Sequence, residues 1–67
     1  MQFSEAWPAL LSGAKIRLPH WKGYWVWENS TIMMHCADGS VIDIRETDNV
    51  AFTFDNVASH CWEIIKD

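Results

Sequence analysis

The sequence predicts one α+β domain in which a short N-terminal helix packs on a small, strongly antiparallel β-sheet. The chain has 67 residues, which is enough for a single hydrophobic core. Apolar side chains recur at helical spacing up to Gly13, and beyond it the pattern becomes extended. Between two extended segments stands Asp38-Gly39, a strong hairpin signal. We therefore treat residues 1–67 as one domain whose strands are joined by short turns.

The helix is predicted over Ser4–Ser12. Ser4 is suited to be its N-cap, Glu5 favours the first turn, and Gly13 suits the position after the last turn. Pro8 lies so near the start that it removes at most the first intrahelical hydrogen bond. The apolar residues that would share one face of this helix are Phe3, Ala6, Trp7, Leu10 and Leu11.

Extended segments account for most of the remaining chain. We expect strands at Ala14–Leu18, Tyr24–Glu28, Ile32–Ala37, Ser40–Arg45, Val50–Phe54 and Trp62–Lys66. In the fifth of them Val50, Phe52 and Phe54 alternate and would lie on one face. The segment Asp55–His60 is expected to be a turn or a single helical turn.

Composition and charge exclude several classes of function. Five Lys and Arg against nine Asp and Glu give a net charge of -4, which argues against a binder of duplex nucleic acid. No apolar run approaches the roughly 20 residues that cross a bilayer. No secretory signal is visible in Met1–Glu5, and two cysteines are not expected to make a disulfide framework. A cytoplasmic protein without a membrane partner is expected.

The chain also predicts a homo-oligomer. A domain of about 60 residues buries only about 60% of its unfolded surface, and such chains often gain burial by association. Five tryptophans are an excess that suggests a subunit interface or a ligand pocket. Tyr24–Trp27 is apolar on both faces of its strand, and a partner subunit is the simplest cover for the second face.

One local patch is basic. No acidic residue lies between Ala6 and Trp27, and that window holds the cations Lys15, Arg17 and Lys22, together with His20. Trp21 lies within the patch. Cations beside flat aromatic rings suit a ligand that has phosphates and a purine. The alternative interpretation is a solvated strand edge beside tryptophans of the core.

Catalysis is not predicted. The chain has no glycine-rich phosphate loop, nucleophile elbow or paired carboxylate motif. The pairs His35-Cys36 and His60-Cys61 suggest a metal site, but adjacent strand residues point to opposite faces. Zinc held by one residue of each pair and a neighbouring subunit is the alternative. We expect a non-enzyme without cofactor or metal.

Both ends and the middle of the chain contain an ordered set of motif residues. In the opening segment these are Phe3, Glu5, Ala6, Ala9, Leu10, Gly13, Lys15, Ile16, Arg17 and Trp21. They follow the opening of the phage Thoeris anti-defence 2 family, which the chain resembles and whose members typically begin with Phe-x-Glu-Ala-Leu and Leu-x-x-Gly-Lys-Lys-Val-x-Arg, followed by a Trp. Ala37-Asp38-Gly39 is similar to the central turn of the family, and Asn56–Glu63 is similar to its closing Asp-Ile-Leu-Ala-x-Asp-Trp-Glu. The chain departs from the family at Trp7-Pro8, at Asn56 and at Cys61.

The resemblance implies a small non-catalytic sponge. Members assemble as dimers or tetramers and sequester cyclic ADP-ribose isomers made by bacterial immune sensors, so that the Thoeris effector stays inactive in the infected host cell. Within this interpretation Trp21 or Trp27 is the stacking platform, and Phe3 is a second aromatic wall. Arg17 is the phosphate clamp because its guanidinium binds bidentately, with Lys15 and Lys22 as point charges. The alternatives are a sponge for cyclic oligonucleotides, an anti-CRISPR-like inhibitor that binds a protein, and a structural or regulatory subunit that has no ligand.

Overall fold

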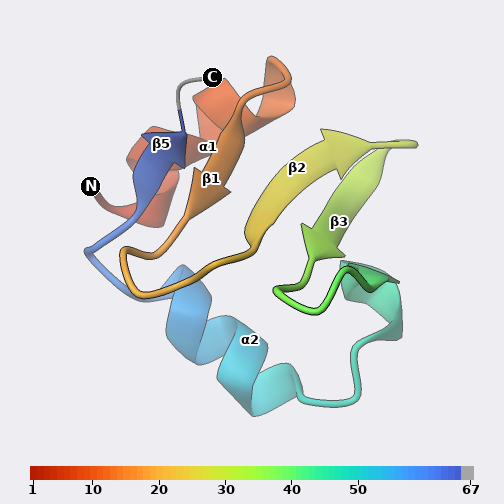
Figure 1. Cartoon of the computed structure of the whole chain (residues 1–67). Helices are drawn as coiled ribbons and strands as arrows, with labels where there is room; N and C mark the ends of the chain where they lie inside the picture. The colour runs from red at the N-terminus through yellow and green to blue at the C-terminus, as the bar shows by residue number, and fades with distance from the viewer. Residues whose placement is uncertain (66–67) are drawn as a thin grey trace.

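The fold is α+β, as the sequence predicts. A computed structural model describes residues 1–65 and contains two helices and a five-stranded antiparallel sheet of order β4-β3-β2-β1-β5 (Figure 1). In chain order the elements are α1 (Phe3–Leu11), β1 (Lys15–Arg17), β2 (Tyr24–Glu28), β3 (Thr31–His35), β4 (Val41–Asp43), the 3-10 helix η1 (Ile44–Glu46), α2 (Val50–Val57) and β5 (Glu63–Ile65). Within residues 1–65 no helix is long and apolar enough to cross a membrane.

Helix α1 begins earlier than the sequence predicts. Its N-cap is Gln2 rather than Ser4, because the Gln2 backbone N–H donates a hydrogen bond to the Glu5 carboxylate over 3.0 Å. Pro8 lies within the helix without ending it. The helix ends before Gly13, whose φ of +105° suits the residue that turns the chain into β1.

The register of the sheet places alternate residues on two different faces. Directly paired residues point to the same face, so Ile16, Trp25, Met34, Ile42 and Ile64 form one row across the five strands. This is the helix face, because Ile16 and Trp25 pack with Ala6 and Leu10 of α1. The residues between them point to the opposite face: Lys15, Arg17, Tyr24, Val26, Met33 and His35.

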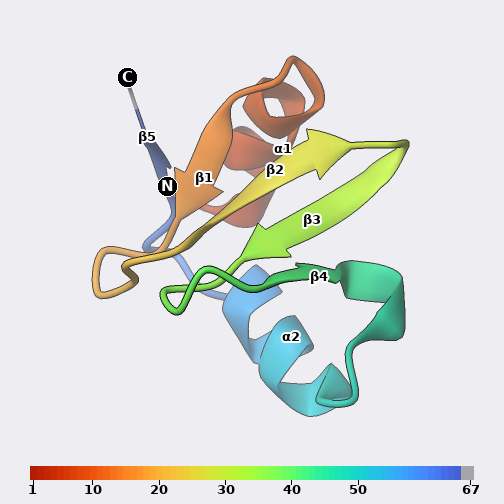
Figure 2. The ribbon, with the colours of Figure 1, turned by 45° about the vertical axis from the view of Figure 1, so that its right-hand side comes forward.

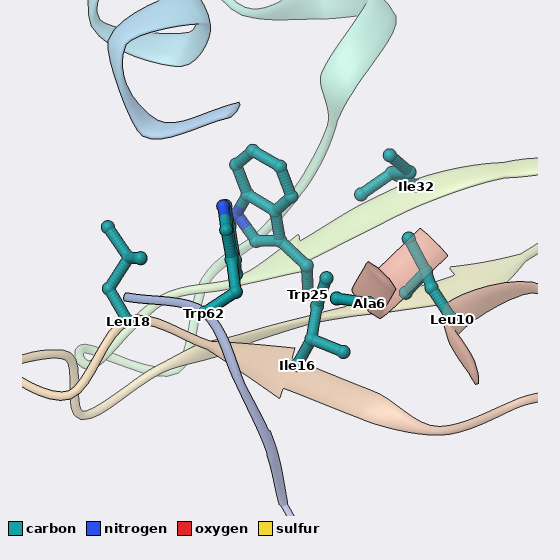
Figure 3. Close-up of a cluster of buried hydrophobic side chains, with 7 residues drawn as sticks. All are labelled: Ala6, Leu10, Ile16, Leu18, Trp25, Ile32 and Trp62. Carbon is teal, nitrogen blue, oxygen red and sulfur yellow. The ribbon is translucent and has the colours of Figure 1, made fainter. Parts of the chain in front are cut away.

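The core lies between α1 and the helix face. Ala6, Leu10 and Ile16 are fully buried, and Trp62 is only 1% exposed. The indole rings of Trp25 and Trp62 lie side by side, with centroids 4.9 Å apart (Figure 3). The Trp62 indole N–H donates to the Asn56 carbonyl over 2.9 Å, which fastens the end of α2 to this core.

The β2–β3 and β3–β4 hairpins have short connections. Asn29 and Ser30 join β2 to β3 with φ values of +55° and +62°, the conformation of a type I′ turn. The predicted Asp38-Gly39 hairpin is confirmed: Gly39 has a φ of +91°, and the Cys36 N–H donates to the Ser40 carbonyl over 2.8 Å. Figure 2 shows this second hairpin beside α2.

One predicted strand is wrong. Val50–Phe54 belongs to α2 rather than to the sheet. The Asn49 side chain accepts a hydrogen bond from the Phe52 N–H over 3.1 Å and so caps a helix at this point. The helix buries Thr53 and Asn56, and it leaves Phe52 56% exposed.

The predicted bounds of Tyr24–Glu28 are confirmed, but the ends of the remaining strands differ from prediction. β4 ends at Asp43 instead of Arg45, because the Asp43 carboxylate accepts the Arg45 N–H over 2.9 Å and starts η1. The predicted segment Asp55–His60 contains the last turn of α2. β5 begins at Glu63, and Lys66 of the predicted final strand lies outside the described residues.

Candidate functional site

A cavity of about 540 Å³ lies between the sheet and α2, and we name it the α2 cavity. One wall is the loop 20–23 that joins β1 to β2. A second wall is the β3–β4 hairpin with its row residues Met34 and Ile42, and the third is α2 with Phe52, Thr53 and Asn56. The volume falls in the usual range of roughly 300–1,000 Å³ for small-molecule sites.

Aromatic rings dominate two sides of this cavity. Trp21 is half-buried, and its ring centroid lies 5.6 Å from that of Trp25 and 5.4 Å from that of Trp62. Phe52 reaches the cavity from α2 and is more than half exposed. A flat ligand between Trp21 and Phe52 would therefore meet apolar rings from two separate elements.

The backbone around Trp21 is fixed by two contacts. Its N–H donates to the Leu18 carbonyl over 3.0 Å, and its carbonyl accepts from the Arg17 guanidinium over 3.4 Å. Gly23 follows, and a Cβ at that position would collide with the His35 carbonyl oxygen. Only glycine lets the loop 20–23 pass so close to β3.

Polar groups lie at the rim and along the α2 wall. Lys22 and His20 are exposed on the loop 20–23, and both line the cavity. Thr53 and Asn56 line it from α2 although both are buried. The site therefore combines aromatic surface, one cationic side chain at the rim and hydrogen-bonding groups on the helix.

His35 connects the cavity with the opposite face of the sheet. Its ring stacks on Tyr24, with centroids 4.6 Å apart and an interplanar angle of 11°. Its buried Nε2 lies 3.5 Å from a Glu28 carboxylate oxygen, and no hydrogen bond satisfies this nitrogen. On the same face the Lys15 ammonium lies 5.0 Å from the Tyr24 ring centroid, in cation–π geometry.

The six residues that the sequence singles out do not form one site. Trp21 and Lys22 line the α2 cavity. Lys15 and Arg17 point to the opposite face, where the Arg17 Nε donates to Glu63 over 2.7 Å. The remaining two, Phe3 and Trp27, pack around α1, where each contacts Trp7 edge-on or tilted.

The sequence interpretation missed the residues that α2 supplies. Phe52, Thr53 and Asn56 come to the cavity only because residues 50–57 are helical. The available signal was Asn49, a favoured N-cap residue directly before an apolar segment. The alternating Val-x-Phe-x-Phe pattern outweighed it.

A metal centre has no support in the described residues. Across residues 1–65 there is no group of three or more His, Cys, Asp or Glu side chains that could hold an ion. Cys36 is half-buried beside the cavity and Cys61 is exposed, and both are free thiols.

Comparison of the chain with known protein families and with curated proteins finds no match.

Proposed function

We propose that this protein is a non-catalytic phage anti-defence protein that binds and sequesters a cyclic ADP-ribose-type signalling nucleotide. The observation that carries the proposal is one cavity lined by Trp21, Phe52 and Lys22. The resemblance of both chain ends to the Thoeris anti-defence 2 family supplies the class of ligand. In this proposal the protein acts as a homo-oligomer in the cytoplasm of the infected cell.

The chemistry of the cavity suits such a ligand. A purine stacked on an aromatic ring contributes about 1–3 kcal/mol, and Trp21 and Phe52 offer two rings. Lys22 lines the cavity and can meet a phosphate. The Asn56 side chain can form hydrogen bonds with ribose hydroxyls or base edges, whereas the Thr53 hydroxyl donates to the Asn49 carbonyl over 3.0 Å and is left to accept. A sponge without turnover needs a nanomolar Kd, roughly 12 kcal/mol, so the rings, the cation and the hydrogen bonds must act together.

Arg17 has a different role in this proposal from the one that the sequence suggested. Its guanidinium is already paired with Glu63 and also holds the Trp21 carbonyl. A phosphate that used Arg17 would have to displace a carboxylate at 2.7 Å. We therefore assign Arg17 to positioning Trp21 and Lys22 to the phosphate.

The test is calorimetric titration of cyclic ADP-ribose isomers and cyclic oligonucleotides into wild-type protein and three variants. Trp21→Ala should weaken binding about 5- to 150-fold, the equivalent of about 1–3 kcal/mol. Lys22→Glu should weaken it at least tenfold. Lys15→Glu makes the same change in charge on the opposite face and is the matched control, for which we expect less than a twofold change.

Two results would overturn the proposal in different ways. If Lys15→Glu weakened binding as much as Lys22→Glu, the ligand would lie on the opposite face, and the assigned site would be wrong. If wild-type protein bound none of the nucleotides at a nucleotide concentration 100 times the expected nanomolar Kd, the sponge function itself would be excluded. The search would then turn to the alternative, an anti-CRISPR-like inhibitor that binds a protein.

A further inference from the structure

Helix α2 exposes apolar side chains on the side that faces away from the sheet. Val50 and Phe54, one helical turn apart, are 55% and 66% exposed. Ala58, the C-cap residue, continues the same row one turn later and is also exposed. Thr53 and Asn56 are buried instead. A helix normally turns its apolar stripe inwards, so this arrangement calls for a second apolar surface.

A complementary groove lies next to this row. It has a volume of about 590 Å³ and separates the first turns of α1 from the end of α2. Phe3 and Trp7 form one wall, with ring centroids 5.9 Å apart, and Val57 and Ala58 form the other. We name this hollow the α1–α2 groove. In Figure 1 the end of α2 and the beginning of α1 approach each other on this side of the molecule.

The projecting ring and the groove share one surface. Ala58 belongs both to the exposed row and to the wall of the groove, and it lies about 6 Å along the helix from Phe54 at 1.5 Å per residue. A two-fold axis between two copies would therefore let each Phe54 enter the groove of the other. Such an isologous contact uses the same surface on both copies, so it forms a closed dimer.

We propose that a second copy of this chain occupies the α1–α2 groove through its Phe54. The polar groups fit as well, since Asp55 follows Phe54 and His60 lies at the rim of the groove, where an imidazole N–H can donate to a carboxylate. The inference gives a contact surface to the homo-oligomer of the proposed function. It does not require a ligand, and the α2 cavity lies outside this contact.

The contact is small. Two-thirds of a phenylalanine surface, taken as roughly 200 Å², is roughly 130 Å² for each Phe54. Two such rings bury little compared with the roughly 1,200–2,000 Å² of a stable specific interface. The dimer should therefore dissociate at micromolar concentration, and its mass should depend on concentration.

The first experiment compares two aspartate variants by native mass spectrometry and by light scattering over a range of concentrations. Phe54→Asp should halve the mass of the wild-type assembly. Leu11→Asp, at an exposed apolar position at the end of α1, is the matched control and should leave the mass unchanged. Far-UV circular dichroism must show equal folding of both variants. A Phe54→Asp protein with wild-type mass would overturn the inference, and so would equal dissociation by Leu11→Asp.

A charge-swap experiment tests the direction of the contact. Ala58→Lys blocks the groove and keeps the projecting ring, so it should also be monomeric. The two variants are then mixed. At one contact, Phe54 of the Ala58→Lys chain enters the unchanged groove of the Phe54→Asp chain. At the other contact, the carboxylate introduced by Phe54→Asp meets the ammonium group introduced by Ala58→Lys. A heterodimer of mixed mass is therefore expected although each variant alone is monomeric, and its absence would contradict the geometry.

Failure of this inference is distinguishable from failure of the proposed function. Calorimetry with a cyclic ADP-ribose isomer is repeated on Phe54→Asp. A wild-type protein that binds the nucleotide while it remains monomeric at all concentrations would overturn the dimer, and with it the homo-oligomer of the proposed function, but not the nucleotide site. A dimer of the expected kind that binds no nucleotide would overturn only the sponge.

Discussion

Trp62 joins α2 to the core, and Trp62→Phe measures how far the stability of the fold depends on this contact. The indole is 1% exposed and packs against Phe3, Trp21 and Trp25. Its N–H donates to the Asn56 carbonyl over 2.9 Å. Phenylalanine keeps an aromatic ring at the site but removes both the donor and part of the buried surface.

The expected loss of stability follows from these two changes. The Asn56 carbonyl also accepts the Ser59 N–H over 3.1 Å, so it does not become unsatisfied, and the lost bond costs about 1 kcal/mol. The smaller ring removes the equivalent of about two methylene groups of buried surface, at roughly 0.8 kcal/mol each. We therefore expect a loss of about 2–3 kcal/mol, a large part of the roughly 3–5 kcal/mol that a core of this size supplies.

The assay is urea denaturation followed by far-UV circular dichroism, together with thermal unfolding. A loss of about 2–3 kcal/mol should lower Tm by roughly 10–20 °C in a domain of this length. Trp27→Phe is the control, because Trp27 is only half-buried and contacts Trp7 at its edge. A loss below about 0.5 kcal/mol for Trp62→Phe, or one no larger than that of the control, would refute the assigned role.

Three further predictions concern the sheet and its turns. Gly23→Ala should destabilise the fold by more than about 2 kcal/mol in urea titration, because the new Cβ collides with the His35 carbonyl oxygen, and a neutral result would show that the loop can shift. Ser30→Gly should raise stability by about 0.5–1 kcal/mol, because serine holds a φ of +62° that glycine adopts freely, and a destabilised variant would contradict the assigned turn. Hydrogen bonds from the Arg45 side chain and backbone lower the pKa of the Asp43 carboxyl from its usual 3.8. The stability that Asp43 adds is therefore complete above about pH 4 and is lost as the pH falls through its lowered pKa in the folded state. Asp43→Asn should then differ from wild type at about pH 6 and converge with it in acid, and a constant difference between about pH 6 and pH 2 would disprove the linkage.

Periodicity was enough to predict most of the sheet but not α2. Tyr24–Glu28 has the same bounds in the sequence interpretation and in the structure, because a short run of aromatic and β-branched residues favours a strand. Val50–Phe54 failed for a physical reason. Its apolar residues alternate as in a strand, but in the fold these positions are largely exposed, while the polar Thr53 and Asn56 are buried. In this helix the hydrophobic residues therefore do not mark the buried face.

The candidate site shows a related limit. The sequence places Lys15, Arg17 and Trp21 in one basic and aromatic patch, but strand alternation sends the first two to the face opposite Ile16. Buried Ile16 could have indicated this split, since its neighbours must point the other way. Which face contains a cavity depends on α2, and that helix was not predicted. Trp21 and Lys22 remain together because they lie in the loop 20–23, where no alternation separates them.

The measurement that tests the central proposal most directly is native mass spectrometry of wild-type and Trp21→Ala protein with a panel of cyclic ADP-ribose isomers. The proposal predicts that wild-type protein retains an isomer and releases it at unchanged mass on denaturation. Trp21→Ala should lose most of the bound nucleotide without a change in subunit composition. A released ligand of altered mass would identify an enzyme instead. Equal retention by the two proteins would show that the nucleotide does not bind at the α2 cavity.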